Sequence, residues 1–449
     1  MSALKVAIVG SGPAGCYAAG LLLERPDVHV DLFDRLPTPW GLVRAGVAPD
    51  HRRTKQVADS FERLVDHPRF RFHLNVEIGT HISHEELVAT HHAVLYSVGA
   101  SEDRRLEIPG EDLPGSHAAT EFVGWYNGHP DHRHHSFDLS AERAVVIGNG
   151  NVALDIARIL AQPASALATT DIADHALEAL LRSKVEEVVV LGRRGPVQAA
   201  YTTPELLGLG DLPDVDVVVD PAEVALDDVS RAYLDSERCS FADRLKTQVV
   251  REYAGRATKQ GRRIVLRFLG SPVEIVGDSH VTGLYVVRNR LVDGDPEPTA
   301  VPTEESELVE TGLVLRSVGY RARPVPGLPF DQRRGVIPNT AGRVVDLDGR
   351  RRRGVYTAGW IKRGPSGVIG TNKRCAAETV TALLQDHADG LLTDPVADVD
   401  VLLAQRQPRE VRAAEWRRID AHETRAGQAH GRPRIKLTEV ATMLEVAGR

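Results

Sequence analysis

Residues 4–15 read LKVAIVGSGPAG and contain the pattern that decides the fold. Residues 4–9 have the length and apolar character of a buried strand, and glycine then recurs at positions 10, 12 and 15. This GxGxxG spacing turns the chain sharply, lets a pyrophosphate approach the backbone and lets the next helix pack against the sheet. We therefore expect a phosphate-binding turn followed by a helix, with contacts from Gly10, Gly12, Pro13, Ala14 and Gly15.

A second apolar strand, residues 29–33, follows this helix and ends at Asp34. A carboxylate at this place in a dinucleotide fold accepts hydrogen bonds from ribose hydroxyls. A GxGxxG pattern alone can be a structural turn, but here the strands, helix and acid come in the expected order. Further along, Ser83 and Glu86 have the spacing of a capping box and predict the start of another helix.

The same order restarts at residue 143, where an apolar strand leads into a GxGxxA turn. The next strand ends in Arg193 and Arg194 instead of an acid. Guanidinium groups pair with the 2′-phosphate of NADP, whereas a carboxylate suits the free 2′-hydroxyl of NAD. Two solvated surface arginines are the alternative interpretation. We expect NADPH at this second turn, bound by Gly148, Gly150, Asn151, Val152, Arg193 and Arg194.

Two such units predict an α/β fold with two dinucleotide-binding, Rossmann-like domains, because 449 residues are too many for one compact core. Both units close on a Ser-Val-Gly sequence, at residues 97–99 and 317–319. We expect one domain to be inserted into the other. The outer domain comprises residues 1–105 and 325–449, and the inner domain comprises residues 106–324.

Composition excludes several classes of function. A net charge of −7 argues against a nucleic-acid binder, and no apolar run approaches the roughly 20 residues that span a bilayer. The N-terminus lacks the pattern of a signal peptide, so we expect a cytoplasmic protein. Cys16, Cys239 and Cys375 are too far apart for a zinc or iron–sulfur ligand set, and the His-rich residues 129–135 are interpreted as a polar loop, so we expect no metal.

Two dinucleotide sites imply a bound flavin and a diffusing nicotinamide coenzyme. Flavin accepts a hydride and releases electrons singly, so it can couple NADPH to a one-electron acceptor. The order of the sites and the arginine pair favour FAD in the first site. A third glycine-rich turn, residues 359–371, precedes another helix and can direct backbone donors at the flavin. Trp360 in this turn stacks on a ring system or, alternatively, is a core aromatic.

The longer motifs resemble the adrenodoxin-reductase-like ferredoxin–NADP+ reductases, and most closely their actinobacterial branch. The similarity extends over nearly the whole chain. It rests on GSGPAG (10–15), LPTPWGLVR (36–44), GVAPDH (46–51), GNGNVALD (148–155), GRRGP (192–196), GWIKRGP (359–365) and HGRPR (430–434).

The resemblance implies FAD in the outer domain and NADPH in the inner one. It places Trp40, Gly41 and Leu42 along the flavin, and Gly359, Trp360, Gly367, Val368 and Ile369 over its ring. It also implies that His51 lies near the flavin, where it tunes hydride transfer and does not drive it; a helix-capping surface histidine is the alternative. Glu205 matches the first acid of the family motif TxxELRE, but Leu207 and Gly208 replace the later Arg and Glu.

The implied partner is a ferredoxin, a small acidic iron–sulfur protein. An acidic enzyme needs a local basic patch to bind it. We expect this patch among Arg44, Arg52, Arg53, Lys55, Lys362, Arg363, Arg238, Arg244, Lys246 and Arg251. We expect a monomer or weak dimer. An NADPH diaphorase acting on quinones and a flavoprotein subunit of a larger complex remain alternatives.

Overall fold

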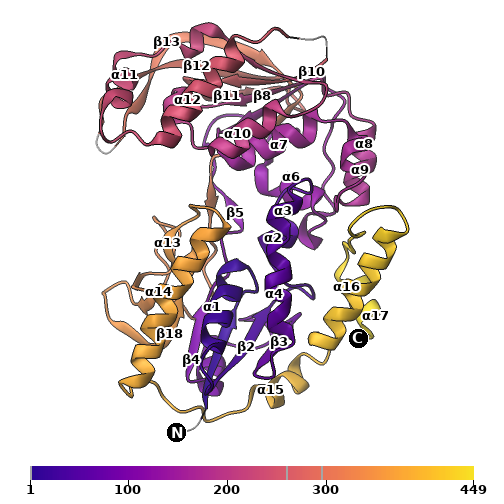
Figure 1. Ribbon diagram of the computed structural model, residues 1–449, viewed down its shortest axis with the longest axis vertical. Helices are drawn as coiled ribbons and strands as arrows, with labels where there is room; N and C mark the ends of the chain where they lie inside the picture. The colour runs from indigo at the N-terminus through magenta and orange to yellow at the C-terminus, as the bar shows by residue number, and fades with distance from the viewer. Residues whose placement is uncertain (1–2, 259–260, 295–296) are drawn as a thin grey trace. The chain divides into compact units, whose positions relative to one another are not determined.

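The computed structural model describes residues 3–258, 261–294 and 297–449, and the chain falls into two compact units. Unit 1 comprises Met1–Glu102, Asn127–Arg133 and Gly319–Arg449, and unit 2 comprises Asp103–Tyr126 and His134–Val318. Each unit contains a mainly or wholly parallel sheet with flanking helices, which confirms the predicted α/β fold with two Rossmann-like halves (Figure 1). The short strands β5 (Glu102–Asp103) and β15 (Tyr320–Arg321) lie where the chain passes between units.

The sheet of unit 1 has the strand order β16-β17-β18-β4-β1-β2-β3 in the described residues. β1 pairs in parallel with β2 on one side and with β4 on the other, so the strand order reverses at β1. Ligands of such sheets bind beyond the carboxyl end of the strand where the order reverses. The strands are β1 (Leu4–Val9), β2 (Val28–Asp34), β3 (Phe70–Leu74), β4 (Ala93–Tyr96), β16 (Asn339–Thr340), β17 (Arg343–Val345) and β18 (Arg351–Thr357).

Helices of unit 1 cover this sheet, and α1 and α14 lie side by side (Figure 1). They are α1 (Pro13–Leu23), α2 (Leu42–Ala45), α3 (Arg52–Lys55), α4 (Val57–Val65), α5 (His84–Thr90), α13 (Trp360–Arg363), α14 (Ile369–Ala388), α15 (Val399–Arg406), α16 (Ala413–Gln428) and α17 (Val440–Ala447). No helix in the described part of the chain is both long enough and apolar enough to cross a membrane.

β1 is buried on both faces from Val6 to Val9, which explains the apolar sequence of these residues. Leu4, Val6 and Ile8 pack into a hydrophobic cluster that includes residues of α1 and α14. Ala7 and Val9 belong to a second cluster on the other side of the sheet. The turn that follows β1 is therefore anchored on a strand whose residues, apart from the exposed Lys5, are all buried.

Unit 2 repeats this plan with the strand order β6-β14-β7-β8-β10-β9 in the described residues, and it adds a three-stranded antiparallel sheet, β11-β12-β13. The strands are β6 (Ser116–Ala118), β7 (Arg143–Ile147), β8 (Glu187–Leu191), β9 (Val215–Val219), β10 (Arg262–Arg267), β11 (Gly270–Val276), β12 (Gly283–Val292), β13 (Thr299–Glu310) and β14 (Leu313–Arg316). The helices are α6 (Ala119–Tyr126), α7 (Asn151–Ala161), α8 (Ala164–Leu167), α9 (Asp174–Leu181), α10 (Thr203–Gly210), α11 (Asp228–Asp235) and α12 (Phe241–Ala254).

Unit 2 differs from the expected inner domain because Asn127–Arg133 belongs to unit 1. The Oδ1 atom of Asn127 accepts hydrogen bonds from Lys55 and Lys436, each at 3.3 Å. Asp131 forms an ion pair with Arg35 at 2.5 Å. These side-chain contacts join residues far apart in the sequence. A single range, residues 106–324, could therefore not show that Asn127–Arg133 belongs to unit 1.

Candidate dinucleotide sites

The glycine turn of unit 1 contains two positions that tolerate no side chain. Gly10 has φ +103°, and a Cβ there would lie 2.6 Å from the carbonyl oxygen of Ser97. A Cβ on Gly15 would lie 2.1 Å from the carbonyl oxygen of Gly10. Both glycines are therefore required by close packing between the turn, α1 and the end of β4.

Gly12 is different, because a Cβ there would meet nothing within 4 Å. It is the N-cap of α1, has φ −72° and makes no side-chain capping bond; Pro13 is the first helical residue. The free N–H groups and the positive end of a helix dipole favour an anion at such a position. The open space at Gly12 is what a pyrophosphate needs to approach the backbone.

Two further glycines bring other segments up to this turn. A Cβ on Gly41 would lie 2.9 Å from the Cα of Gly12, and a Cβ on Gly359 would lie 2.7 Å from the Cβ of Ala14. The residues before α14 also lack a side-chain cap: Gly367 has φ +80°, and the N-cap Val368 is 55% exposed. The first turn of α1 is thus flanked by the loop at residue 41 and the turn at residue 359, and α14 starts at Ile369.

Asp34 lies at the end of β2 and fixes the turn as well as offering an acceptor. Its Oδ2 accepts hydrogen bonds from the N–H of Ser11 at 2.9 Å and from Ser11 Oγ at 2.5 Å. Its Oδ1 accepts a hydrogen bond from the N–H of Leu36 at 3.0 Å. Since a carboxylate oxygen can accept more than one hydrogen bond, Oδ1 retains capacity for a ribose hydroxyl.

The side chain of Trp40 is only 5% exposed and packs in the core. Its ring makes tilted or edge contacts with Phe61, Phe72 and Trp416 at centroid distances of 5.7–6.3 Å. Its backbone has φ +80°, an uncommon value for a non-glycine residue. The resemblance led us to expect Trp40 along the flavin; its ring faces the core instead, so only its backbone and the neighbouring Gly41 and 42% exposed Leu42 can line a ligand.

Trp360, at the start of α13, stacks on Tyr320 at a centroid distance of 5.3 Å with 27° between the ring planes. It is half-buried, and among the described residues no group accepts a hydrogen bond from its buried Nε1. A buried donor of this kind normally has a partner. The observation therefore fits a ligand acceptor beside Trp360.

The turn of unit 2 repeats the geometry of the first. Gly148 has φ +125°, and a Cβ there would lie 2.1 Å from the carbonyl oxygen of Ser317. This close approach corresponds to that between Gly10 and the carbonyl oxygen of Ser97 in unit 1. Gly150 is the N-cap of α7, and a Cβ there would meet nothing within 4 Å. Val152 lies in the first turn of α7, while the side chain of Asn151 accepts a hydrogen bond from the N–H of Thr202 at 2.7 Å.

The two arginines after β8 are not equivalent. Arg193 is exposed, and none of the described side chains forms an ion pair with it. The guanidinium of Arg194 forms an ion pair with Glu297. Within the described residues, Arg194 is thus engaged by a carboxylate, and no ion pair of Arg193 is found.

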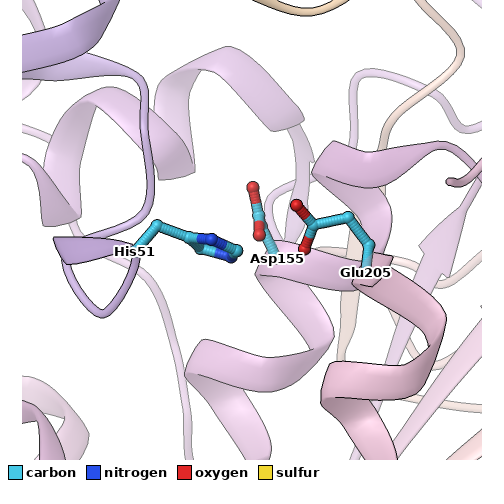
Figure 2. Close-up of side chains that lie close together, drawn as sticks. All are labelled: His51, Asp155 and Glu205. Carbon is cyan, nitrogen blue, oxygen red and sulfur yellow. The ribbon is translucent and has the colours of Figure 1, made fainter. Parts of the chain in front are cut away.

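Glu205, on α10, belongs to an acidic pair that the sequence did not reveal. Its carboxylate points toward that of Asp155 on α7, with oxygens within 4.8 Å (Figure 2). Arg158, which is 6% exposed, pairs with Asp155 at 2.7 Å and with Glu205 at 3.6 Å. The sequence shows that Asp155 and Arg158 are three positions apart in the otherwise apolar α7, which indicates an ion pair between them. It does not show that Glu205, from another helix, joins this pair.

His51, also drawn in Figure 2, is the N-cap residue of the short helix α3 in unit 1, but its side chain makes no capping hydrogen bond. His51 thus has the N-cap position that the alternative expects, but its side chain does not cap the helix. Its backbone carbonyl accepts a hydrogen bond from the N–H of Lys55 at 3.1 Å. His51 remains a candidate for a role at the site of unit 1.

Several residues expected in a basic patch are engaged inside the protein. Arg44 pairs with Glu423, Lys362 with Glu378 at 2.5 Å, and Lys246 with Asp243 at 2.9 Å. Arg363 binds the backbone carbonyl of Ser366 at 2.6 Å and so braces the loop before α14. Exposed side chains remain at Arg52, Arg53, Arg238, Arg244 and Arg251.

Comparison with known proteins places this geometry in a family. Residues 4–194 match the family model described as pyridine nucleotide-disulphide oxidoreductase. The chain is 50% identical to NADPH-ferredoxin reductase FprA of Mycobacterium tuberculosis, with 98% of each chain covered. It belongs to the adrenodoxin-reductase-like ferredoxin–NADP+ reductases. The resemblance inferred from the motifs is confirmed.

A further relative and a solved structure of FprA show that the similarity extends over the whole chain. The mitochondrial NADPH:adrenodoxin oxidoreductase of Salvelinus fontinalis is 42% identical, over 99% of this chain and 91% of its own. The solved structure of Mycobacterium tuberculosis FprA in complex with NADPH superposes with a TM-score of 0.93 at 48% identity, covering 99% of this chain and all of its own. The family assignment therefore rests on the whole chain and not on the glycine turns alone.

Proposed function

We propose that the chain is an FAD-dependent ferredoxin–NADP+ reductase that takes electrons from NADPH and passes them singly to a ferredoxin. The observation that carries this proposal is the pair of glycine turns, one in each unit, beside strands that end differently. Asp34 suits the ribose of FAD, and Arg193 and Arg194 suit the 2′-phosphate of NADPH. One site of each kind connects a two-electron coenzyme to a one-electron carrier.

Unit 1 fits FAD in three ways. The start of α1 offers uncapped N–H groups beside the open space at Gly12, where the pyrophosphate would bind. The uncapped start of α14 and the free Nε1 of Trp360 offer donors for the flavin ring. Bound there, FAD supplies a ring that accepts a hydride and releases single electrons. Leu42 would exclude water from it.

Unit 2 fits NADPH through Gly150, the first turn of α7 and the two arginines. Arg193 offers an exposed guanidinium, and guanidinium groups bind phosphates bidentately. Glu205 and Asp155 are fixed by Arg158, so their carboxylates keep one orientation. We assign this acidic pair a positioning role for the nicotinamide end, because hydride transfer itself needs no acid or base.

The proposed protein partner is a small acidic iron–sulfur protein, bound by a monomer or weak dimer of the reductase. The exposed Arg52 and Arg53 support docking on unit 1 because they closely follow helix α2, which begins at Leu42. Electrostatic attraction between such a patch and an acidic carrier raises the association rate and weakens as salt increases.

The test is reduction of cytochrome c by NADPH with and without added ferredoxin, at low and high salt. Ferredoxin should stimulate the reaction strongly at low salt, whereas reduction of ferricyanide should change little. Reversing both Arg52 and Arg53 to Glu should reduce the ferredoxin-dependent rate alone. Arg350→Glu is the matched control for each single reversal, Arg52→Glu or Arg53→Glu, since this exposed arginine precedes β18 at the end opposite Gly359.

The competing function is an NADPH diaphorase for quinones and other small acceptors. It predicts full activity with small acceptors and no dependence on ferredoxin. If ferredoxin neither binds at low salt nor stimulates the reduction of cytochrome c, the proposal is wrong and the diaphorase function is supported instead.

A further inference from the structure

The backbone that carries Arg193 and Arg194 is fixed by the antiparallel sheet of unit 2. Asn289 of β12 is 3% exposed, and its Nδ2 donates to the carbonyl of Arg193 and to Ser271 Oγ, both at 2.8 Å. The N–H of Leu269 donates to the carbonyl of Arg194 at 3.1 Å. The position of the two arginines is therefore set by buried hydrogen bonds and not by their exposed side chains.

A carboxylate next to the same sheet forms an ion pair with Arg194. Glu297 lies between β12 and β13, and its carboxylate forms an ion pair with the Arg194 guanidinium. The Glu297 side chain is 66% exposed, whereas that of Arg194 is 25% exposed. Glu297 can therefore turn into water at little cost, while Arg194 remains in place.

We propose that Glu297 lowers the preference for NADPH over NADH by competing with the 2′-phosphate of NADPH for Arg194. This inference rests on the proposed function, in which Arg193 and Arg194 bind that phosphate. Carboxylates and phosphates both accept the paired N–H donors of a guanidinium, so they compete for the same group. NADH has no 2′-phosphate and gains nothing from displacing Glu297. The pair thus lowers NADPH affinity and leaves NADH affinity unchanged.

The expected size of the effect follows from the exposure of the pair. Exposed ion pairs contribute little, so release of Arg194 should tighten NADPH binding by roughly two- to fivefold. A larger gain would require a buried carboxylate, which Glu297 is not.

The decisive variant is Glu297→Gln, which removes the charge and keeps the size of the side chain. Dissociation constants are measured for NADPH, NADH, adenosine 2′,5′-bisphosphate and AMP. Binding of NADPH and of the bisphosphate should tighten by the same factor, and binding of NADH and AMP should not change. Glu305→Gln is the matched control, because it also removes one negative charge. Glu305 lies on β13, is exposed and forms no ion pair within the described residues.

An Arg194→Ala background separates this inference from the proposed function. If Glu297 acts through Arg194, Glu297→Gln should have no effect there beyond that of Glu305→Gln. If Arg194→Ala alone leaves NADPH binding unchanged, the phosphate-binding role itself is wrong. If Arg194→Ala weakens NADPH binding but Glu297→Gln in the native background fails to tighten it, competition by Glu297 is excluded.

Discussion

Arg44 and Glu423 are 379 positions apart in the chain, yet their side chains form a bidentate ion pair almost closed to solvent. The two contacts measure 2.8 and 2.5 Å, and the side chains are 9% and 0% exposed. Burial raises the pKa of the Glu423 carboxyl, but Arg44 and Arg434 outweigh this and keep it below its ordinary value. With the contact between Trp40 and Trp416, this pair fixes the segment at residues 40–44 to α16 at two points.

Glu423→Gln should destabilise the protein strongly, because it leaves the Arg44 guanidinium buried without its counter-ion. Removing one partner of a buried pair costs about 3–5 kcal/mol in the free energy of unfolding, measurable by urea denaturation. The control is Asp66→Asn, which breaks the exposed pair of Asp66 with Arg417 and should cost less than about 1 kcal/mol. Equal losses in the two variants would show that burial of the Arg44 pair has no energetic weight.

Gly12→Ala should abolish FAD retention while leaving the apoprotein folded. The added methyl group meets no atom of the chain and φ is ordinary, so the cost to the apoprotein should stay within about 1 kcal/mol. The same methyl group would fill the space that the pyrophosphate needs. Flavin content and apoprotein unfolding are the two readouts. Gly20→Ala, within the same helix, is the control and should keep full FAD. Normal FAD content in Gly12→Ala would contradict the assigned pyrophosphate position.

Replacing both Arg193 and Arg194 by Ala should raise the dissociation constant of NADPH far more than that of NADH. Loss of two charge-assisted contacts to a phosphate corresponds to about 3 kcal/mol, or roughly a hundredfold. Arg193→Ala alone should account for the larger part, because Arg194 must first release Glu297. Coenzyme titrations of the three variants measure this, and equal losses for the two coenzymes would refute phosphate recognition.

His51→Ala should retain FAD and slow the reduction of the flavin by less than about tenfold, because hydride transfer requires no proton donor or acceptor. Anaerobic stopped-flow measurement of flavin absorbance after mixing with NADPH gives the rate. A rate lowered by more than about a hundredfold, with FAD still bound, would assign His51 an essential role instead.

Asp103 should make unit 2 more stable as the pH falls from neutral. Burial raises the pKa of its carboxyl from 3.8 to about 6, and the hydrogen bond from Thr120 offsets this only in part. The folded state therefore binds the proton more tightly than the unfolded state, so this stabilisation is complete below pH 3.8 and lost as the pH rises through about 6. The free-energy difference between the native protein and Asp103→Asn should decrease from pH 4 to pH 7. A constant difference would contradict the raised pKa.

Local sequence patterns predicted the elements that position the sites. The strand expected at residues 4–9 is β1, and the capping box of Ser83 and Glu86 starts α5 as expected. These features depend on neighbours within a few positions, so periodicity and spacing are sufficient to reveal them.

Contacts between distant side chains were not predictable in this way. Trp40 belongs to the core because Phe61, Phe72 and Trp416 surround its ring. Lys246 is buried because its Nζ donates to the carbonyl of Ala199 at 2.8 Å. The engagement of Arg194 by Glu297 joins residues 103 positions apart. In each case the residue type suggested a role in binding a ligand or a partner protein, but the structure shows contacts of its side chain with residues from elsewhere in the chain.

Unit 1 is built from separate parts of the chain, and this imposes an order on folding during synthesis. The N–H of Ala358 donates to the carbonyl of Tyr96 at 2.9 Å, and β18 pairs directly with β4, so this sheet closes only when the chain beyond residue 350 has left the ribosome. Unit 2 contains only residues 103–126 and 134–318 and is complete earlier. Domains fold as units during synthesis. The nascent chain therefore completes unit 2 first, and β4 has no partner on its β18 side until the last third of the protein has been synthesised.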